Sequence, residues 1–211
     1  MLAIFVDKPD LPHALQTFIY QQNHPNSSCP SSLDNSFDGP IHVFHSAKVQ
    51  FYVPSDLCGA GGMLQETIRT NPNYAGSPRF DTVFISVGDE EAMDGLLATH
   101  VLLLFTFFDP YHGKDIPCAL ITWFMHPKSG PERDILTGMW KLHPEQDVDG
   151  RHLIQVIHLD AILWGAHLLP CYGEGFLPVG LSNNDALDAW DAYLVNQFID
   201  YHAHWLLAQS T

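Results

Sequence analysis

The chain has 211 residues, of which 46% are hydrophobic, and its formal net charge at pH 7 is −15. This length and apolar content suit one globular domain, or one domain with an extension, that can build a hydrophobic core. Only 9 Lys and Arg residues stand against 24 Asp and Glu residues. Direct binding to nucleic acid is therefore not expected, because phosphate contacts need basic side chains.

The cysteines are spread along the chain at positions 29, 58, 118 and 171 and form no CxxC pair. Secreted disulfide scaffolds are short and cysteine-dense, so we expect reduced thiols in an intracellular protein, with Cys118 in the core. The most apolar run, 96–108, is shorter than the roughly 20 residues that span a bilayer. We therefore expect no association with membranes.

Residues 1–40 are predicted to form a short helix followed by a polar linker. Asp10 can cap the helix, Pro12 fits its first turn, and the apolar side chains at 11, 15, 18 and 19 form one face. Residues 22–40 are rich in Asn, Ser, Pro and Asp, which is typical of a surface loop. We assign residues 41–211 to a separate β-rich domain.

The next segment, 41–53, alternates apolar and polar residues and predicts a half-buried strand with a bend near Ser46. Residues 54–78 are predicted to be an irregular connection, and 162–169 a helical turn or short helix. Asp109–Asp115 reads as a hairpin loop. The further predicted strands are 80–87, 99–108, 118–125 and 154–159, with a short edge strand at 139–142.

Near the C-terminus, large apolar side chains recur every three or four residues and predict one long helix of roughly 20 residues starting near Ser182–Asp185. The stripe consists of Leu187, Trp190, Leu194, Phe198, Tyr201 and Trp205. We expect Trp190, Phe198 and Trp205 to be mostly buried against the strands. The predicted fold class is α+β, mainly β: a small barrel or curled antiparallel sheet with this long helix packed on it.

Several segments together resemble the C-terminal region of the Plavaka-type transposon proteins of fungi, within the CACTA-like group. They are Ile41–Met63 (IHVFHSAKVQFYVPSDLCGAGGM), Arg79–Phe84, Pro117–Phe124, Thr137–Trp140, Val156–Gly173 and Leu187–Trp205. In that family the acidic residues that cut DNA lie upstream of this region. The resemblance therefore implies a non-catalytic accessory domain that contacts the transposase core. The order of apolar strands is also similar to the bromo-adjacent-homology family, a β-rich chromatin-associated module.

Two groups of residues are candidates for catalysis. Cys58 precedes a glycine turn and could be a nucleophile if a histidine such as His42 or His45 lay nearby. The alternative is a structural thiol in a turn where Asp56 accepts backbone hydrogen bonds and Gly59 and Gly62 take positive φ. His158 and Asp160 would share one strand face and could serve a proton relay or a metal. The alternative is a packed or hydrogen-bonded histidine.

Aromatic residues provide a candidate binding site of another kind. Tyr52, Trp123, Phe124 and Trp140 could form a cage for methylated lysine, which an acidic surface would help to recruit. The alternative is core packing. We expect no cofactor and no metal site, because no zinc-ligand spacing such as HExxH is present.

The function predicted from the sequence is that of a non-catalytic interaction domain, with the transposase core or a basic chromatin protein as its partner. One alternative is a nuclear chromatin-reading module that binds basic histone tails. The other is an enzyme that depends on Cys58 or on the His158–Asp160 pair. An open aromatic cage rimmed by acids would favour the reader, and a cleft containing Cys58 and a histidine would favour the enzyme.

Overall fold

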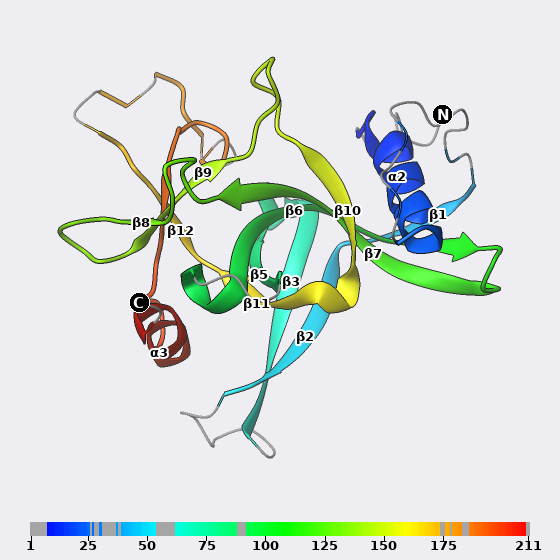
Figure 1. The fold of residues 1–211 in the computed structure, drawn as a ribbon, viewed down its shortest axis with the longest axis horizontal. Helices are drawn as coiled ribbons and strands as arrows, with labels where there is room; N and C mark the ends of the chain where they lie inside the picture. The colour runs from blue at the N-terminus through cyan, green and yellow to red at the C-terminus, as the bar shows by residue number, and fades with distance from the viewer. Residues whose placement is uncertain are drawn as a thin grey trace.

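One long hairpin forms the centre of the fold (Figure 1). The computed structural model describes residues 8–25, 27, 30, 37, 39–53, 62–87, 92–173, 176–177, 179–182 and 186–209. Strands β6 (Leu96–Asp109) and β7 (Lys114–Met125) pair antiparallel along most of their length. The turn between them confirms the predicted hairpin loop, and Gly113 at φ +64 supplies the left-handed conformation that the turn needs. Both strands were predicted, and each is longer than expected.

The hairpin belongs to a sheet that curls into a nearly closed barrel. The strand order is β11-β5-β6-β7-β9-β13-β12, with all neighbours antiparallel. The strands added to the hairpin are β5 (Thr82–Ser86), β9 (Trp140–Pro144), β11 (Ile162–Ala166), β12 (Leu168–Pro170) and β13 (Tyr193–Val195). Because β11 and β12 follow each other in the chain at the two ends of this order, the sheet returns on itself. A barrel-like mainly β fold is confirmed.

Three short strands extend this sheet from its sides. They are β1 (Ile41–Phe44), which pairs with β6, β10 (Ile154–His158), which pairs with β7, and β8 (Glu132–Arg133), which pairs with β9. The predicted strand at 154–159 is confirmed by β10. The predicted edge strand at 139–142 corresponds to β9, but β9 lies inside the sheet between β7 and β13, so its edge position was wrong.

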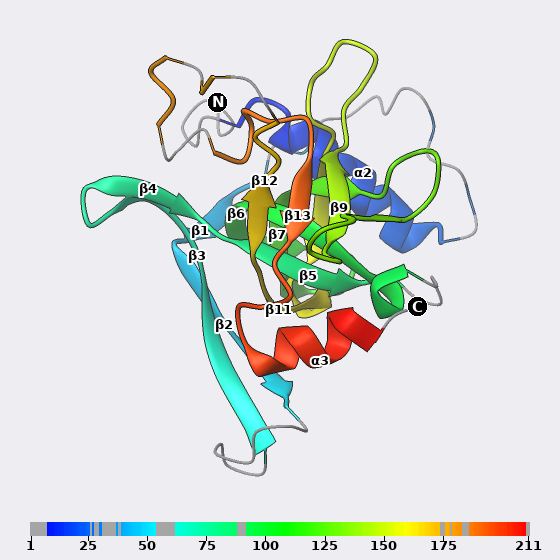
Figure 2. The same cartoon turned by 90° about the vertical axis from the view of Figure 1, so that its left-hand side faces the viewer.

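A second sheet of order β2-β3-β4 leaves the barrel as a twisted ribbon (Figures 1 and 2). It contains β2 (Ser46–Tyr52), β3 (Met63–Tyr74) and β4 (Ser77–Phe80). Only His45 separates β1 from β2, which confirms the bend predicted near Ser46. The predicted irregular connection is wrong from residue 63 onward, because the polar sequence of β3 is held in place by its antiparallel pairing with β2. Residues 54–61 lie outside the described residues.

The segment 162–169, predicted to be helical, forms β11 and β12 instead. Successive side chains of β11 point to opposite faces of the sheet, and Ile162 and Ala166 at its two ends are buried. Pairing of β11 with β5 and of β12 with β13 overrides the weak local preference for helix. The helical turn η3 (Leu159–Ala161) only connects β10 to β11.

The predicted long C-terminal helix is wrong. Residues 186–190 form turns, Leu194 lies in β13, and the helix α3 (Tyr201–Gln209) has only 9 residues. Phe198 is 59% exposed and Trp205 40% exposed, so their predicted burial is wrong, whereas Trp190 packs against the core. The reason is tertiary: β13 closes the barrel between β9 and β12, which buries Tyr193 completely. Asp185 lies outside the described residues.

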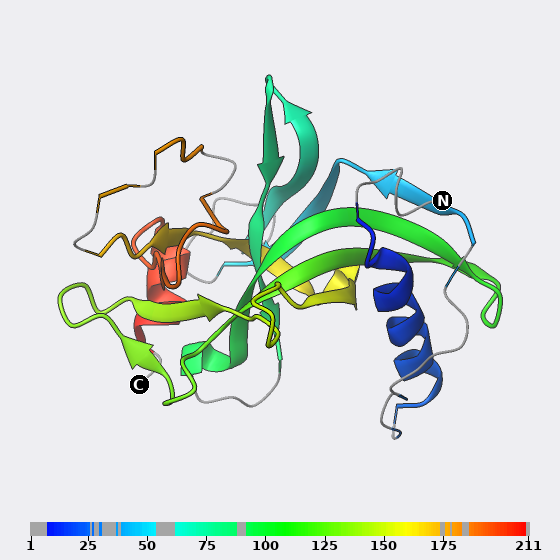
Figure 3. The same cartoon turned by 90° about the horizontal axis from the view of Figure 1, so that it is seen from above.

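The predicted N-terminal helix is confirmed as α2 (Leu11–Asn23). Its buried face, which includes Leu11, Leu15 and Phe18, packs against Phe107 and Ile116 at the turn end of the central hairpin. Asp10 makes no side-chain capping bond, so its predicted role as a cap is wrong. Helices α2 and α3 lie on opposite sides of the barrel (Figures 1 and 3). No helix among the described residues combines the length and apolar content needed to cross a membrane.

Candidate functional site

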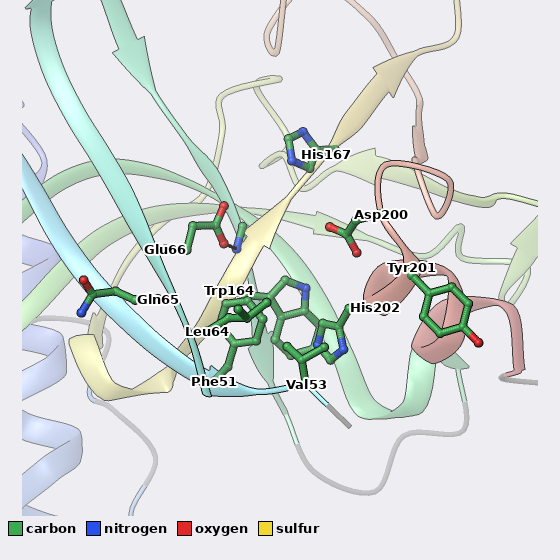
Figure 4. A pocket seen from close by; sticks show the side chains of 11 residues that line it. Phe51, Val53, Leu64, Gln65, Glu66, Trp164, His167, Asp200, Tyr201 and His202 are labelled. Atoms are coloured by element: carbon green, nitrogen blue, oxygen red, sulfur yellow. Dashed lines mark hydrogen bonds between the residues drawn. The ribbon is translucent and has the colours of Figure 1, made fainter. Parts of the chain in front are cut away.

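A cavity of about 480 Å³ lies where the β2–β3 ribbon meets β11 and the start of α3 (Figure 4). We call it the aromatic pocket. It is lined by Phe51, Val53, Leu64, Gln65, Glu66, Trp164, Gly165, His167, Asp200, Tyr201 and His202. These residues come from three separate parts of the chain, so the pocket exists only because the ribbon and α3 converge on the seam of the barrel.

Three rings in mutual contact form the floor of the aromatic pocket. Phe51 stacks on His202, with ring centroids 5.4 Å apart and planes inclined by 25°. Trp164 meets His202 edge-on with ring centroids 5.1 Å apart, and it lies tilted against Phe51 at 5.8 Å. The inward-facing side of β2 supplies Phe51, and β11 supplies Trp164, which also contacts the core residue Phe84 at 5.4 Å. The cluster is therefore anchored to the barrel core.

Two carboxylates rim this floor, and each is held by a backbone amide. The Gly165 N–H donates to Glu66 Oε2 at 2.8 Å, and the Ala203 N–H donates to Asp200 Oδ1 at 2.7 Å in the first turn of α3. Among the described residues, Glu66 Oε1 and Asp200 Oδ2 accept no hydrogen bond. In Figure 4 both carboxylates lie above the ring cluster, Glu66 to the left and Asp200 to the right. Each can therefore accept a hydrogen bond from a ligand.

Gly165 is needed for the position of Glu66. A Cβ atom added at Gly165 would lie 2.6 Å from Glu66 Oε1, closer than non-bonded atoms approach. The absence of a side chain at this position of β11 lets the carboxylate reach the strand backbone. Glu66 thus bridges the ribbon to the barrel while its second oxygen remains at the pocket.

Buried polar atoms without partners gather in the same place. Among the described residues, Trp164 Nε1 and both ring nitrogens of His202 are buried and have no hydrogen-bond partner. Leaving such a group unsatisfied costs about 1–3 kcal/mol. Burial lowers the pKa of His202, and the nearby charge of Asp200 opposes this only in part. His202 is therefore neutral at neutral pH, and the pocket carries an excess of negative charge.

A second cavity of about 220 Å³ adjoins the aromatic pocket, because both are lined by Glu66, Gly165 and His167. Its far side contains Arg79 and Asp81, whose side chains form an ion pair with Nε and Oδ1 2.8 Å apart. The two cavities give a ligand longer than one side chain a continuous surface along β11.

The aromatic residues proposed from the sequence do not line this pocket. Phe124 and Trp140 are buried in the barrel core, as the alternative of core packing predicted. Trp123 donates its Nε1–H to Gln155 Oε1 at 2.9 Å on the surface of the sheet. Tyr52 is exposed on β2 and lies over Gly62, whose φ of +78 confirms the predicted positive value. The four aromatic residues therefore form no common cage: two lie in the core, and two lie on β2 and on the surface of the sheet.

The catalytic candidates are also not brought together. Strand β10 ends at His158 and Asp160 belongs to the following helical turn, so the predicted shared strand face is wrong. His158 packs edge-on against Phe18 of α2 at 4.8 Å, beside a cavity of about 270 Å³ that also contains the hydrogen-bonded pair Asp109 and His112. His158 is a packed histidine.

Cys58, Asp56 and Gly59 lie outside the described residues. Cys118 is fully buried, as predicted, and burial together with the nearby charge of Asp160 raises its pKa to about 12. That thiol is therefore not a nucleophile at neutral pH. Within the described residues, no three His, Cys, Asp or Glu side chains are grouped as metal ligands.

No protein-family model matches this chain, and no curated protein and no solved structure matches it either. The resemblance to Plavaka-type proteins and to the bromo-adjacent-homology module therefore stays a prediction. The class of site defined by the geometry is an acidic pocket with an aromatic floor.

Sequence reasoning missed the residues that form this pocket. Phe51 and Trp164 were attributed to a strand and a helical turn, and Glu66 to an irregular connection. His202 carries no sequence-based prediction. One local signal was available: Asp200 immediately precedes Tyr201 and His202, which is the pattern of a helix cap followed by aromatic residues. The long-range approach of Glu66 to Gly165 left no signal in the sequence.

Proposed function

We propose that this chain is a non-catalytic interaction domain that binds a positively charged side chain of a basic protein partner in the aromatic pocket. The observation that carries the proposal is the combination of an aromatic floor with the rim carboxylates Glu66 and Asp200. A neutral His202 in the floor adds no opposing charge.

The physical chemistry of the pocket favours a cation over other ligands. A cation within about 6 Å of a ring face is attracted by the ring quadrupole, by about 0.5–2 kcal/mol depending on desolvation. A carboxylate that accepts a hydrogen bond from a charged donor adds a bond roughly twice as strong as a neutral one. An anionic ligand would instead meet two fixed negative charges.

The charge of the whole chain supports the same class of partner. A net charge of −15 attracts basic proteins at long range and accelerates encounter with them. Basic chromatin proteins meet this requirement, and the core of a transposase is the partner that the resemblance implies. The pocket then supplies the specific contact that long-range attraction lacks.

The experiment must separate pocket binding from general attraction between opposite charges. Fluorescence anisotropy would be measured with a labelled peptide in which Arg and Lys alternate with Gly. We expect the double variant Glu66→Gln/Asp200→Asn to weaken binding about tenfold or more. Both substitutions keep an oxygen that accepts the Gly165 and Ala203 amides, so the local fold is retained.

The matched control is the double variant Asp149→Asn/Asp188→Asn, which changes the net charge equally at exposed positions away from the pocket. It should bind almost as well as the unchanged protein. Equal losses in the two double variants would mean that binding follows net charge alone, and the proposed function would be wrong.

A further inference from the structure

We infer that the aromatic pocket selects the guanidinium group of arginine over the ammonium group of lysine, methylated or not. The inference rests on the proposed function and specifies the ligand of the same site. It follows from how the rings are spaced, where the carboxylates lie, and how both are held.

The rings are too close together to enclose an ammonium group. A group placed between two ring faces needs about 3.5–4 Å of contact distance on each side, so the faces must stand about 7–8 Å apart. The centroids of Phe51, Trp164 and His202 are only 5.1 to 5.8 Å from one another. The cluster is therefore a closed floor, and a cation can only lie on top of it.

A floor of this kind suits a flat cation. The guanidinium group is planar, is more weakly hydrated than an ammonium, and stacks on an aromatic face while its N–H groups point outward in the plane. A trimethylated ammonium is bulky in all directions and gains most when rings surround it, which the measured spacing prevents.

The carboxylates at the rim of the floor provide acceptors for the donors of a stacked guanidinium. Glu66 comes from β3 and Asp200 from the start of α3, and Figure 4 shows both above the rings in that view, Glu66 to the left and Asp200 to the right. Each keeps one oxygen available among the described residues. Arginine offers five N–H donors, enough to serve both acids, whereas a trimethylated lysine offers none on its head group.

Both acceptors are held before the ligand arrives. The Gly165 amide fixes Glu66, and the Ala203 amide fixes Asp200 at the first turn of α3. Because little side-chain freedom is left to lose on binding, the geometry of the acceptors can discriminate between donors. Gly165 acts as a positioning residue, since a methyl group there would displace the Glu66 carboxylate.

The test uses four peptides that differ at one central residue flanked by glycines: arginine, lysine, trimethyl-lysine and citrulline. Binding to the full chain is followed by NMR through the indole N–H signal of Trp164, assigned with the variant Trp164→Phe. We expect the arginine peptide to bind about tenfold tighter than the lysine and trimethyl-lysine peptides. Citrulline has the same shape without the charge and should bind weakest.

Two variants test which residues produce the preference for arginine. Glu66→Gln should reduce the preference for arginine over lysine. Gly165→Ala should do the same while retaining every charge of the protein, because it only moves the carboxylate. Asp149→Asn, in an exposed loop, should leave the preference unchanged.

The outcomes distinguish this inference from the proposed function. If the arginine and lysine peptides bind equally and Glu66→Gln weakens both, the interaction domain stands and the selectivity is wrong. A preference for trimethyl-lysine would overturn the inference in favour of an enclosing cage. If no peptide perturbs the Trp164 signal, both the selectivity and the proposed function fail.

Discussion

His100 is a titratable residue in the middle of the central strand β6, paired across the sheet with Thr82 and Thr122. It is 9% exposed, and its ring meets Phe80 edge-on at 6.3 Å. Burial, and secondarily the positive charges of Lys8 and His152, lower its pKa from 6.5 to about 4. The folded protein therefore keeps this side chain neutral where the unfolded chain would take up a proton.

The protein should lose stability on acidification for this reason. Between pH 6.5 and about 4 the unfolded state binds the extra proton, so the stabilisation is complete above pH 6.5 and is lost as the pH falls toward 4. The shift corresponds to about 3 kcal/mol. Urea denaturation across this range should show that His100→Gln flattens the pH dependence, whereas His13→Gln on the exposed face of α2 does not. Parallel profiles for the two variants would contradict the assignment.

At the scale of single residues, the sequence predicted the burial of some side chains but not which residues contact one another. It correctly predicted that Cys118 is buried and that core packing was an alternative for Phe124 and Trp140. It could not identify Glu66 and Gly165 as partners, because 99 positions separate them in the chain. Their contact depends on how the ribbon folds back over β11, which no local pattern encodes.

At the scale of elements, α3 is a short helix held at both ends. Asp200 caps its start, while near its end the Leu207 carbonyl accepts hydrogen bonds from Trp140 Nε1 at 3.1 Å and from Arg133 at 3.2 Å. The Arg133 guanidinium also stacks on the Trp140 ring at 3.9 Å. These contacts keep Tyr201 and His202 at the aromatic pocket, although a helix of this length is not stable alone.

Removing one of these donors should loosen the helix and the pocket together. We expect Trp140→Phe to reduce the free energy of unfolding by about 1–3 kcal/mol, because it removes a buried hydrogen bond to Leu207. Amide hydrogen exchange in α3 should accelerate. Trp123→Phe, which removes a hydrogen bond at the exposed Gln155, is the matched control and should have a small effect. Unchanged exchange in α3 would show that other contacts hold it.

The elements that the sequence predicted are those whose pattern is local. The central hairpin and α2 carry long apolar runs or a clear helical face, and both were found. The elements that close the barrel were missed, because Tyr193 and Ile162 gain their burial from strands far away in the chain. The stripe from Leu187 to Trp205 has helical spacing, yet the pairing of β13 outweighs that preference.

At the scale of the whole molecule, several of the few positively charged side chains are engaged by local partners. Arg69 and Arg79 both stack on the Tyr74 ring at 5.3 Å, and Arg79 pairs with Asp81. Lys141 lies 3.3 Å from Glu132. With a net charge of −15, the chain lacks the excess of basic side chains that contacts along a phosphate backbone need.

We therefore expect the purified protein not to bind duplex DNA. A gel-shift assay at physiological salt should give no complex in the range of about 10⁻⁴–10⁻⁶ M that is usual for non-specific binding. The basic peptide of the proposed interaction, added under the same conditions, serves as a positive control for folded protein. A complex with DNA at submicromolar concentration would show that local basic side chains outweigh the overall charge.

The way the aromatic pocket is assembled also governs when it can exist. Its walls come from β2 and β3, from β11, and from the first turn of α3, so it requires residue 202 as well as residue 51. During translation the ribbon and the hairpin emerge long before α3, and domains fold as their parts become available. A growing chain that ends before residue 202 has no complete pocket. Under the proposed function, capture of a basic partner is thus postponed until the barrel seam and α3 have left the ribosome.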